Sequence, residues 1–178
     1  MTSAIGFLYD SYTDAAAAVR DLEAAGISCA DIGFVAGNGT AGESAAGRNA
    51  ETGATVGAAL GVGAGLLAGL GLLTIPGLGP VVAAGWLATT VVGAAAGAGA
   101  GATAGGILGT LTKNGVAETE AHLYAEGVRR GGTLVTVRCD EAEIGAVEQI
   151  MRRHNPVDAD QRRRAYRETG WTGFNESR

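Results

Sequence analysis

The side chains of this chain that could do chemistry are few and scattered. His122 and His154 have no cysteine or carboxylate neighbour at the spacing that a metal site requires. Cys29 and Cys139 form no CxxC pair, and we expect both to be small buried apolar residues in a reducing cytoplasm. No Ser-His-Asp set or P-loop can be assembled. The sequence therefore predicts no catalytic residue, no metal ligand and no cofactor.

Two further patterns resemble sites, and we interpret both as structural. Residues 37–42 match GxGxxG, but a dinucleotide site needs a helix directly after the glycines and an acidic residue at the next parallel strand. Here the chain runs into an uncharged stretch instead, which indicates a loop rich in turn residues. Glu118, Glu120 and Glu126 are predicted to form a solvated helix face rather than a catalytic carboxylate pair.

Charge and composition narrow the class of protein. The chain has 178 residues, of which 31 are glycine, 47% are apolar and only 17% are charged, so a wholly disordered chain is excluded. Residues 1–150 carry a net charge of −8 and residues 151–178 one of +3. An acidic body disfavours nucleic acid as a partner. We expect the tail arginines to be solvated, with anionic lipid or an acidic face of the same protein as alternative contacts; they are Arg162, Arg163, Arg164 and Arg167.

The dominant feature is an uncharged stretch of 61 residues, Thr52–Thr112. Its centre holds two prolines and two glycines, which break helices and favour a turn; the turn residues are Ile75, Pro76, Gly77, Leu78, Gly79 and Pro80. The sequence therefore predicts two helical arms, of roughly 20 and 30 residues, folded back as a hairpin. We expect both feet of this hairpin to leave the same side of the domain.

Glycine recurs at every fourth position in both arms, with Thr89 filling one gap. The glycines are Gly53, Gly57, Gly61, Gly65 and Gly69 in the first arm, and Gly85, Gly93, Gly97, Gly101, Gly105 and Gly109 in the second. Residues four apart share one helix face, so each predicted arm carries a groove without side chains. Close packing of helices across such grooves offsets the low helix propensity of glycine. The pattern predicts a glycine zipper that drives homo-oligomerisation.

The sequence leaves open what buries this hairpin. Residues 56–75 are long enough to span a bilayer, whereas residues 93–106 contain only glycine, alanine and threonine and are weakly hydrophobic. The hairpin is therefore buried either in lipid or in the protein core of a homo-oligomer. A free monomer would expose too much apolar surface in either case.

The flanks predict an α+β domain of ferredoxin-like βαβ-βαβ type, split by the hairpin. The expected strands are residues 4–9, 32–36, 133–138 and 157–160. The expected helices are one from about residue 13 to a stop at Gly26, one over 117–130 stopped by Gly131 and Gly132, and one that opens at Asp140 and Glu143 and ends before Asn155. The regions are then residues 1–43 for the first half of the domain, 44–113 for the hairpin, 114–160 for the second half and 161–178 for a basic tail.

Several segments resemble the YflT-like general stress proteins of bacteria. They are the strand at Gly6 and Phe7, the helix over 14–19, the turn over 75–80, the segment 124–132 and the tail over 166–174. The resemblance implies a role in general, heat or osmotic stress, and it supplies no catalytic residues.

We therefore expect a non-enzymatic stress protein that self-assembles through its hairpin on the cytoplasmic side of the inner membrane, with itself and membrane lipid as partners. A large soluble shell, disc or filament in the cytoplasm is one alternative. A membrane pore and a small-ligand sensor are two others, the last resting only on the expected fold.

Overall fold

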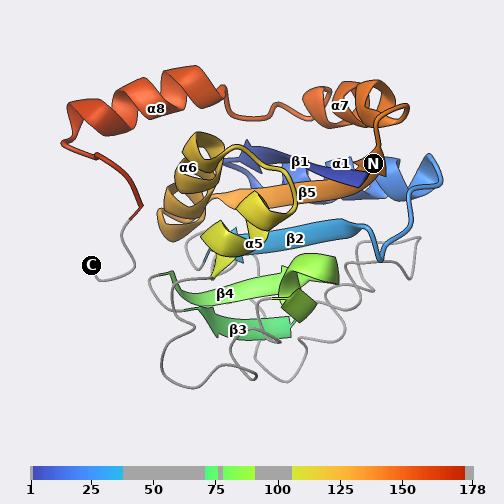
Figure 1. Cartoon of the computed structure of the whole chain (residues 1–178), viewed down its shortest axis with the longest axis horizontal. Coiled ribbons are helices and arrows are strands. Elements are labelled where there is room, and N and C mark those ends of the chain that lie inside the picture. Colours follow the sequence, from blue (N-terminus) through green and yellow to red (C-terminus); the bar gives the residue numbers. More distant parts are fainter. Residues whose placement is uncertain (1, 38–70, 76–77, 91–105, 175–178) are drawn as a thin grey trace.

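The structure is a computed structural model, and it describes residues 2–37, 71–75, 78–90 and 106–174 (Figure 1). Its elements in chain order are β1 (Thr2–Tyr9), α1 (Tyr12–Ala24), β2 (Ile32–Gly37), β3 (Gly71–Ile75), β4 (Gly79–Ala84), α5 (Ile107–Lys113), α6 (Glu118–Arg129), β5 (Thr133–Asp140), α7 (Ile144–Arg152) and α8 (Ala159–Glu168).

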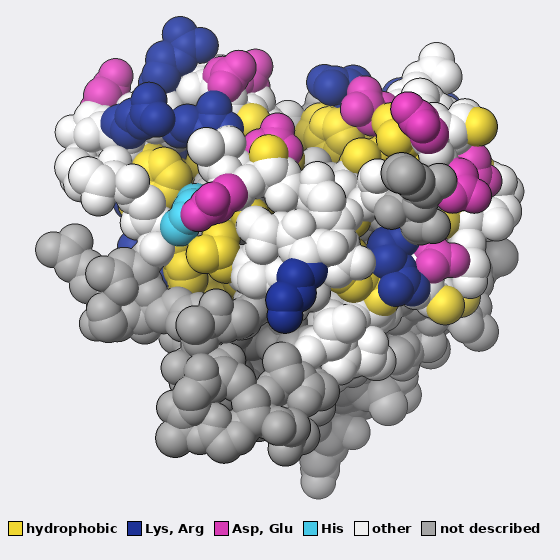
Figure 2. Space-filling model, in the orientation of Figure 1, with side chains coloured by type: hydrophobic (Ala, Val, Ile, Leu, Met, Phe, Trp, Pro, Cys, Tyr) yellow, Lys and Arg dark blue, Asp and Glu magenta, His cyan; other side chains and the backbone are white. Residues whose placement is uncertain are grey.

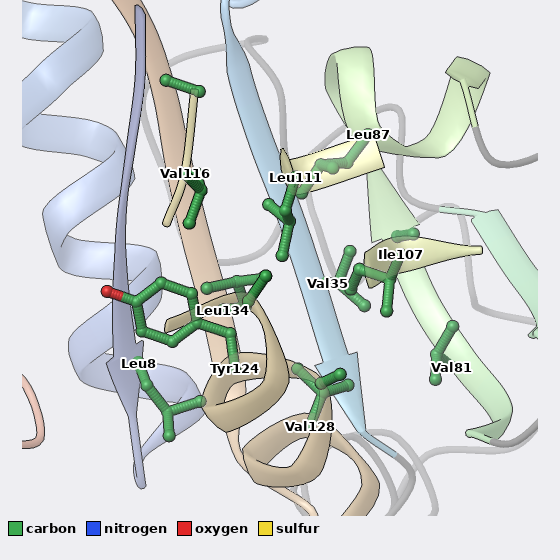
Figure 3. Close-up of a cluster of buried hydrophobic side chains, with 14 of the residues drawn as sticks. Leu8, Val35, Val81, Leu87, Ile107, Leu111, Val116, Tyr124, Val128 and Leu134 are labelled. Carbon is green, nitrogen blue, oxygen red and sulfur yellow. The ribbon is translucent and has the colours of Figure 1, made fainter. Parts of the chain in front are cut away.

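One antiparallel sheet with the strand order β1-β5-β2-β4-β3 forms the middle layer. Helices α1 and α7 cover one face, where Val19 and Met151 join a core with Phe34 of the sheet. Helices α5 and α6 cover the other face, where Leu111 and Val128 join a second core (Figure 3). The chain is thus an α+β protein, as predicted.

Strand β5 lies between two other strands and is covered on both faces, so its first five residues, 133–137, are all buried. This position explains its nearly continuous run of β-branched and apolar residues, because neither face meets water. Leu134 belongs to the core under α6, while Val135 and Val137 belong to the core under α1 and α7.

The predicted helix ends in both halves of the domain are confirmed. Gly26 follows α1 with φ at +92°, a conformation that favours glycine. After α6, Gly131 has φ at +97°, its amide donates to the carbonyl of Val128, and the amide of Gly132 donates to the carbonyl of Gly127. These two bonds form a Schellman motif, which turns the chain directly into β5.

The predicted helical arms are wrong next to the turn. The chain reverses between Ile75 and Gly79 as expected, but the flanking segments are the paired strands β3 and β4. Strand β4 in turn pairs with β2, whose outer edge would otherwise lack hydrogen-bond partners. Leucine, valine and isoleucine beside the turn also favour strands, and together these terms outweigh the four-residue spacing of the glycines.

Only two of the eleven predicted zipper glycines lie in described residues. Gly85 joins β4 to a helical stretch over residues 85–90 and has φ at +73°, so a chain junction explains this glycine. Gly109 lies within α5. Outside the described residues lie Gly53, Gly57, Gly61, Gly65, Gly69, Gly93, Gly97, Gly101 and Gly105.

The expectation that both feet of the insertion leave the same side of the domain is not tested at the first foot, because residue 44 lies outside the described residues. The amide of Gly37 bonds to the carbonyl of Gly132, directly before β5 begins. The carbonyl of Asn114 accepts from Ala4, which pairs near the other end of β5. The described residues nearest to the two feet therefore lie at opposite ends of the sheet.

The fourth strand expected over residues 157–160 does not form, so the ferredoxin-like arrangement is not confirmed. The amide of Val157 donates one hydrogen bond of 2.7 Å to the carbonyl of Leu8 on β1. The carboxylate of Asp158 then accepts a bond from the amide of Gln161 and caps α8. Helix α8 crosses the expected domain boundary at residue 160. It begins at Ala159 because the N-cap Asp158 favours a helix over a continued strand.

Candidate functional site

A cleft of about 550 Å³ lies along the outer edge of β1. Its floor is the backbone of residues 4–8, and one wall comes from α6 and the loop before it, while the other comes from α7. In Figure 1 the linker from α7 to α8 runs along the same edge of the sheet. The residues that line the walls and the end of the cleft are Gly115, Val116, Ala117, Glu120, Tyr124, Glu148, Arg152, Pro156, Val157, Asp158, Ala159 and Asp160.

The backbone groups at this edge are only partly paired. The amide of Ala4 bonds to Asn114 at 2.8 Å, and the carbonyl of Leu8 accepts from Val157. The carbonyl of Gly6 accepts from the Tyr124 hydroxyl, so the even-numbered residues of β1 point their polar backbone groups away from β5. Within residues 2–37, 71–75, 78–90 and 106–174, nothing accepts a hydrogen bond from the amides of Gly6 and Leu8.

The cleft is lined by more negative than positive charge. Its carboxylates are those of Glu120, Glu148, Asp158 and Asp160. Arg152, which also lines the cleft, lies 3.6 Å from Glu148, and Arg163 lies 2.8 Å from Asp160. The carboxylates therefore outnumber the nearby guanidinium groups by two. This excess of negative charge favours a cationic occupant of the cleft.

Tyr124 lines the α6 side of the cleft, and its hydroxyl is directed toward β1 (Figure 3). Its side chain is buried, and its hydroxyl bonds to Gly6 at 2.7 Å. Burial, and secondarily the charge of Glu120, raise the pKa of Tyr124 above its ordinary value, so the hydroxyl stays protonated as a donor. A Cβ on Gly6 would lie 3.2 Å from the Tyr124 ring, so glycine lets the ring pack against the strand.

The lining of the cleft combines carboxylates with the backbone of β1. Its lining contains no histidine, cysteine or serine that could act as a nucleophile or general base. In the described part of the chain, no three His, Cys, Asp or Glu side chains gather so as to hold a metal ion. An acid-lined groove with open backbone amides can instead bind an extended cationic chain.

The two histidines each contact a carboxylate, although their sequence neighbours did not predict it. The Nε2 atom of His154, which follows α7, lies 3.0 Å from the carboxylate of Asp21 on α1. This contact joins the end of α7 to α1. His122 lies 3.8 Å from Glu118, and its Nδ1 accepts a bond from the amide of Phe174. Both histidines thus connect elements of the fold, and neither lies in the cleft.

The two cysteines differ in exposure. Cys139 on β5 is buried as predicted, and burial raises the pKa of its thiol. The prediction for Cys29 is wrong, because this residue is exposed in the connection between α1 and β2. Cys29 lies three positions before Ile32, the first buried residue of β2. It is therefore outside the strand that packs in the sheet.

The expectation that Glu126 is solvated is also wrong. Its side chain is 0% exposed, and its carboxylate accepts two hydrogen bonds from Arg129 and one from Arg130. Glu118, by contrast, is 78% exposed. The arginines three and four positions after Glu126 were the signal in the sequence, since such spacings bring side chains together on a helix.

The basic segment after residue 160 packs on the domain. Its arginines gather at α8 (Figure 2), where Arg162 forms a bidentate ion pair with Asp10. The guanidinium carbon of Arg130 lies over the buried ring of Tyr166, 4.2 Å from the centroid of that ring. Phe174 joins the core beneath α6. Arg162 thus contacts an acidic residue of the same protein, whereas Arg164 and Arg167 are exposed as expected.

Among the residues that the structure describes, every helix is too short or too polar to cross a bilayer. Comparison of the chain with models of known families, with curated proteins and with solved structures finds no match.

Proposed function

We propose that this chain is a non-enzymatic bacterial general-stress protein whose work is self-assembly through its uncharged segment. The observation that carries the proposal is the place of that segment in the fold. Its central part supplies β3 and β4, and β3 ends the sheet with neither a charge nor a proline along its length. Strand edges without such residues favour pairing with further copies.

The glycine spacing supports the same proposal. Residues 52–70 and 91–105 carry no charge and keep glycine at four-residue intervals. We propose that these stretches pack closely against their counterparts in other copies, as small residues allow. The α+β domain then keeps the assembly hydrated, because every charged side chain of the chain lies outside residues 52–112.

For the domain itself we propose a ferredoxin-like unit that has lost its last strand. The order β1-β5-β2 and the placement of α1 and α7 on one face support this proposal. The single hydrogen bond from Val157 to Leu8 marks the position of the missing strand.

The experiment is a measurement of mass by size exclusion with light scattering. The parent chain should elute well above its monomer mass of 17.6 kDa. Gly61→Leu and Gly97→Leu should each lower that mass by forcing packed segments apart. Gly145→Leu is the matched control, since a Cβ there meets no atom within 4 Å and the exposed position leaves the side chain in solvent, so the mass should not change. A parent chain that elutes as a monomer contradicts the proposal.

For the location of the assembly, we propose the cytoplasmic face of the inner membrane, with lipid against the uncharged segment. Carbonate extraction of cell membranes tests this part separately. Retention of the chain in the membrane pellet is the expected result. Release of an intact oligomer into the supernatant would favour the large soluble assembly instead.

A further inference from the structure

We propose that the outer edge of β1 binds a short, extended, basic peptide segment of a partner protein, which adds to the sheet as a strand. This site lies at the opposite edge of the sheet from β3, so it is independent of the self-assembly proposed above. Strand addition of this kind takes its affinity from backbone hydrogen bonds and its specificity from alternate side chains.

The position for the added strand is open because the chain contacts the edge of β1 at Val157 and then leaves it. Val157 makes one bond to β1, after which Asp158 caps α8 and the chain turns away. The cleft occupies the place beside Ala4 and Gly6 where that strand would have continued. A peptide in this place would accept hydrogen bonds from the amides of Gly6 and Leu8.

The walls define the side chains that the peptide needs. Successive residues of an added strand point to opposite faces of the sheet. On the α6 side they meet Glu120, for which no cation lies within ion-pair distance among the described residues. On the α7 side they meet Ile5 and Phe7, which are only partly buried, and the neutral Glu148–Arg152 pair. This arrangement fits lysine or arginine alternating with apolar residues.

The length of the open edge favours a peptide over a second copy of β1. The bonds from Ala4 to Asn114 and from Val157 to Leu8 close its two ends. The five residues from Ala4 to Leu8, both limits included, extend about 14 Å at the rise of a strand. A second β1, with 8 residues, would collide with the segments that close the ends.

The test uses the full chain and a fluorescent peptide in which lysine and valine alternate over five residues. Fluorescence anisotropy measures its affinity, and hydrogen exchange with mass spectrometry follows the segment 2–9. We expect binding that slows exchange of the Gly6 and Leu8 amides within this segment about tenfold, since paired strand amides exchange only on opening. Two control peptides should not bind: one with glutamate in place of lysine, and one with N-methylated backbone amides.

Protein variants locate the site independently of the peptide. Glu120→Gln should weaken binding about threefold, the size of effect that an exposed charge pair supports. Glu141→Gln is the matched control, because Glu141 is exposed and outside the cleft. Three results would overturn the proposal: no binding of the basic peptide, equal binding of its N-methylated form, or slow exchange of the Gly6 and Leu8 amides before any peptide is added.

Discussion

The hydroxyl of Tyr124 donates a 2.7 Å hydrogen bond to the carbonyl oxygen of Gly6, a residue 118 positions earlier in the chain. This contact ties α6, which follows the uncharged segment, to β1, which precedes it. It joins the two halves of the domain on the face opposite to α1, and it also forms one side of the cleft. Its energetic contribution can be measured directly.

Tyr124→Phe should lower the free energy of unfolding by about 1 kcal/mol, because it removes one buried hydrogen bond and keeps the packed ring. Denaturant unfolding followed by circular dichroism measures the change. Tyr12→Phe is the control, since the Tyr12 hydroxyl bonds to no other group in the described ranges. Equal stability of Tyr124→Phe and the parent chain would contradict a contribution from the Gly6 contact.

Stability should fall at alkaline pH. Burial raises the pKa of both Tyr9 and Tyr124 above the ordinary value of 10.0. The folded chain therefore holds these protons more tightly than the unfolded chain, so this stabilisation is complete below pH 10.0 and is lost as the pH rises above it. Each tyrosine should contribute a slope of about 1.4 kcal/mol per pH unit. Denaturant unfolding across this range measures the slope, which Tyr124→Phe should reduce; an unchanged slope would count against it.

Glu126→Gln should lower the free energy of unfolding by about 2 kcal/mol, because it removes the charge that three arginine hydrogen bonds surround. The arginine side chains are partly exposed and can reach water, which keeps the loss below that of a fully buried pair. Glu118→Gln on the same helix should change stability by less than about 0.5 kcal/mol. Similar unfolding midpoints for the two variants would show that burial of Glu126 is energetically unimportant.

Gly37→Ala should lower the free energy of unfolding by about 3 kcal/mol or more. A Cβ at this position would collide with the backbone carbonyl of Val128 and lie 2.9 Å from the Cα of Gly131, and neither backbone atom can move cheaply. Gly145→Ala on α7 is the contrasting variant. It meets no atom within 4 Å and should stabilise the chain by about 0.5 kcal/mol through helix propensity. Thermal unfolding compares the two, and a Gly37→Ala chain as stable as Gly145→Ala would contradict the close approach.

The elements outside the uncharged segment could be predicted well because local signals agree there. Glycine after α1 and α6, and the apolar runs at β1, β2 and β5, act within a few residues of where they occur. The start of α8 also had a local signal, Asp158 before a run of helix-forming residues, but a strand was expected there. The expected fourth strand would have lain beside β1, where the structure has the cleft. The cleft was therefore not predicted.

What the sequence by itself determined is therefore a set of local choices: the strands and helices within residues 2–37 and 118–152, the glycines that end α1 and α6, and that 61 consecutive residues carry no charge. The tertiary structure alone decided which strands became neighbours. Residues 71–75 and 79–84 are strands because the edge of β2 offered backbone partners, a fact that no window of sequence contains. It likewise buried Glu126 and left the amides of Gly6 and Leu8 without an acceptor among the described residues, since hydrogen-bond pairing depends on which elements meet in space.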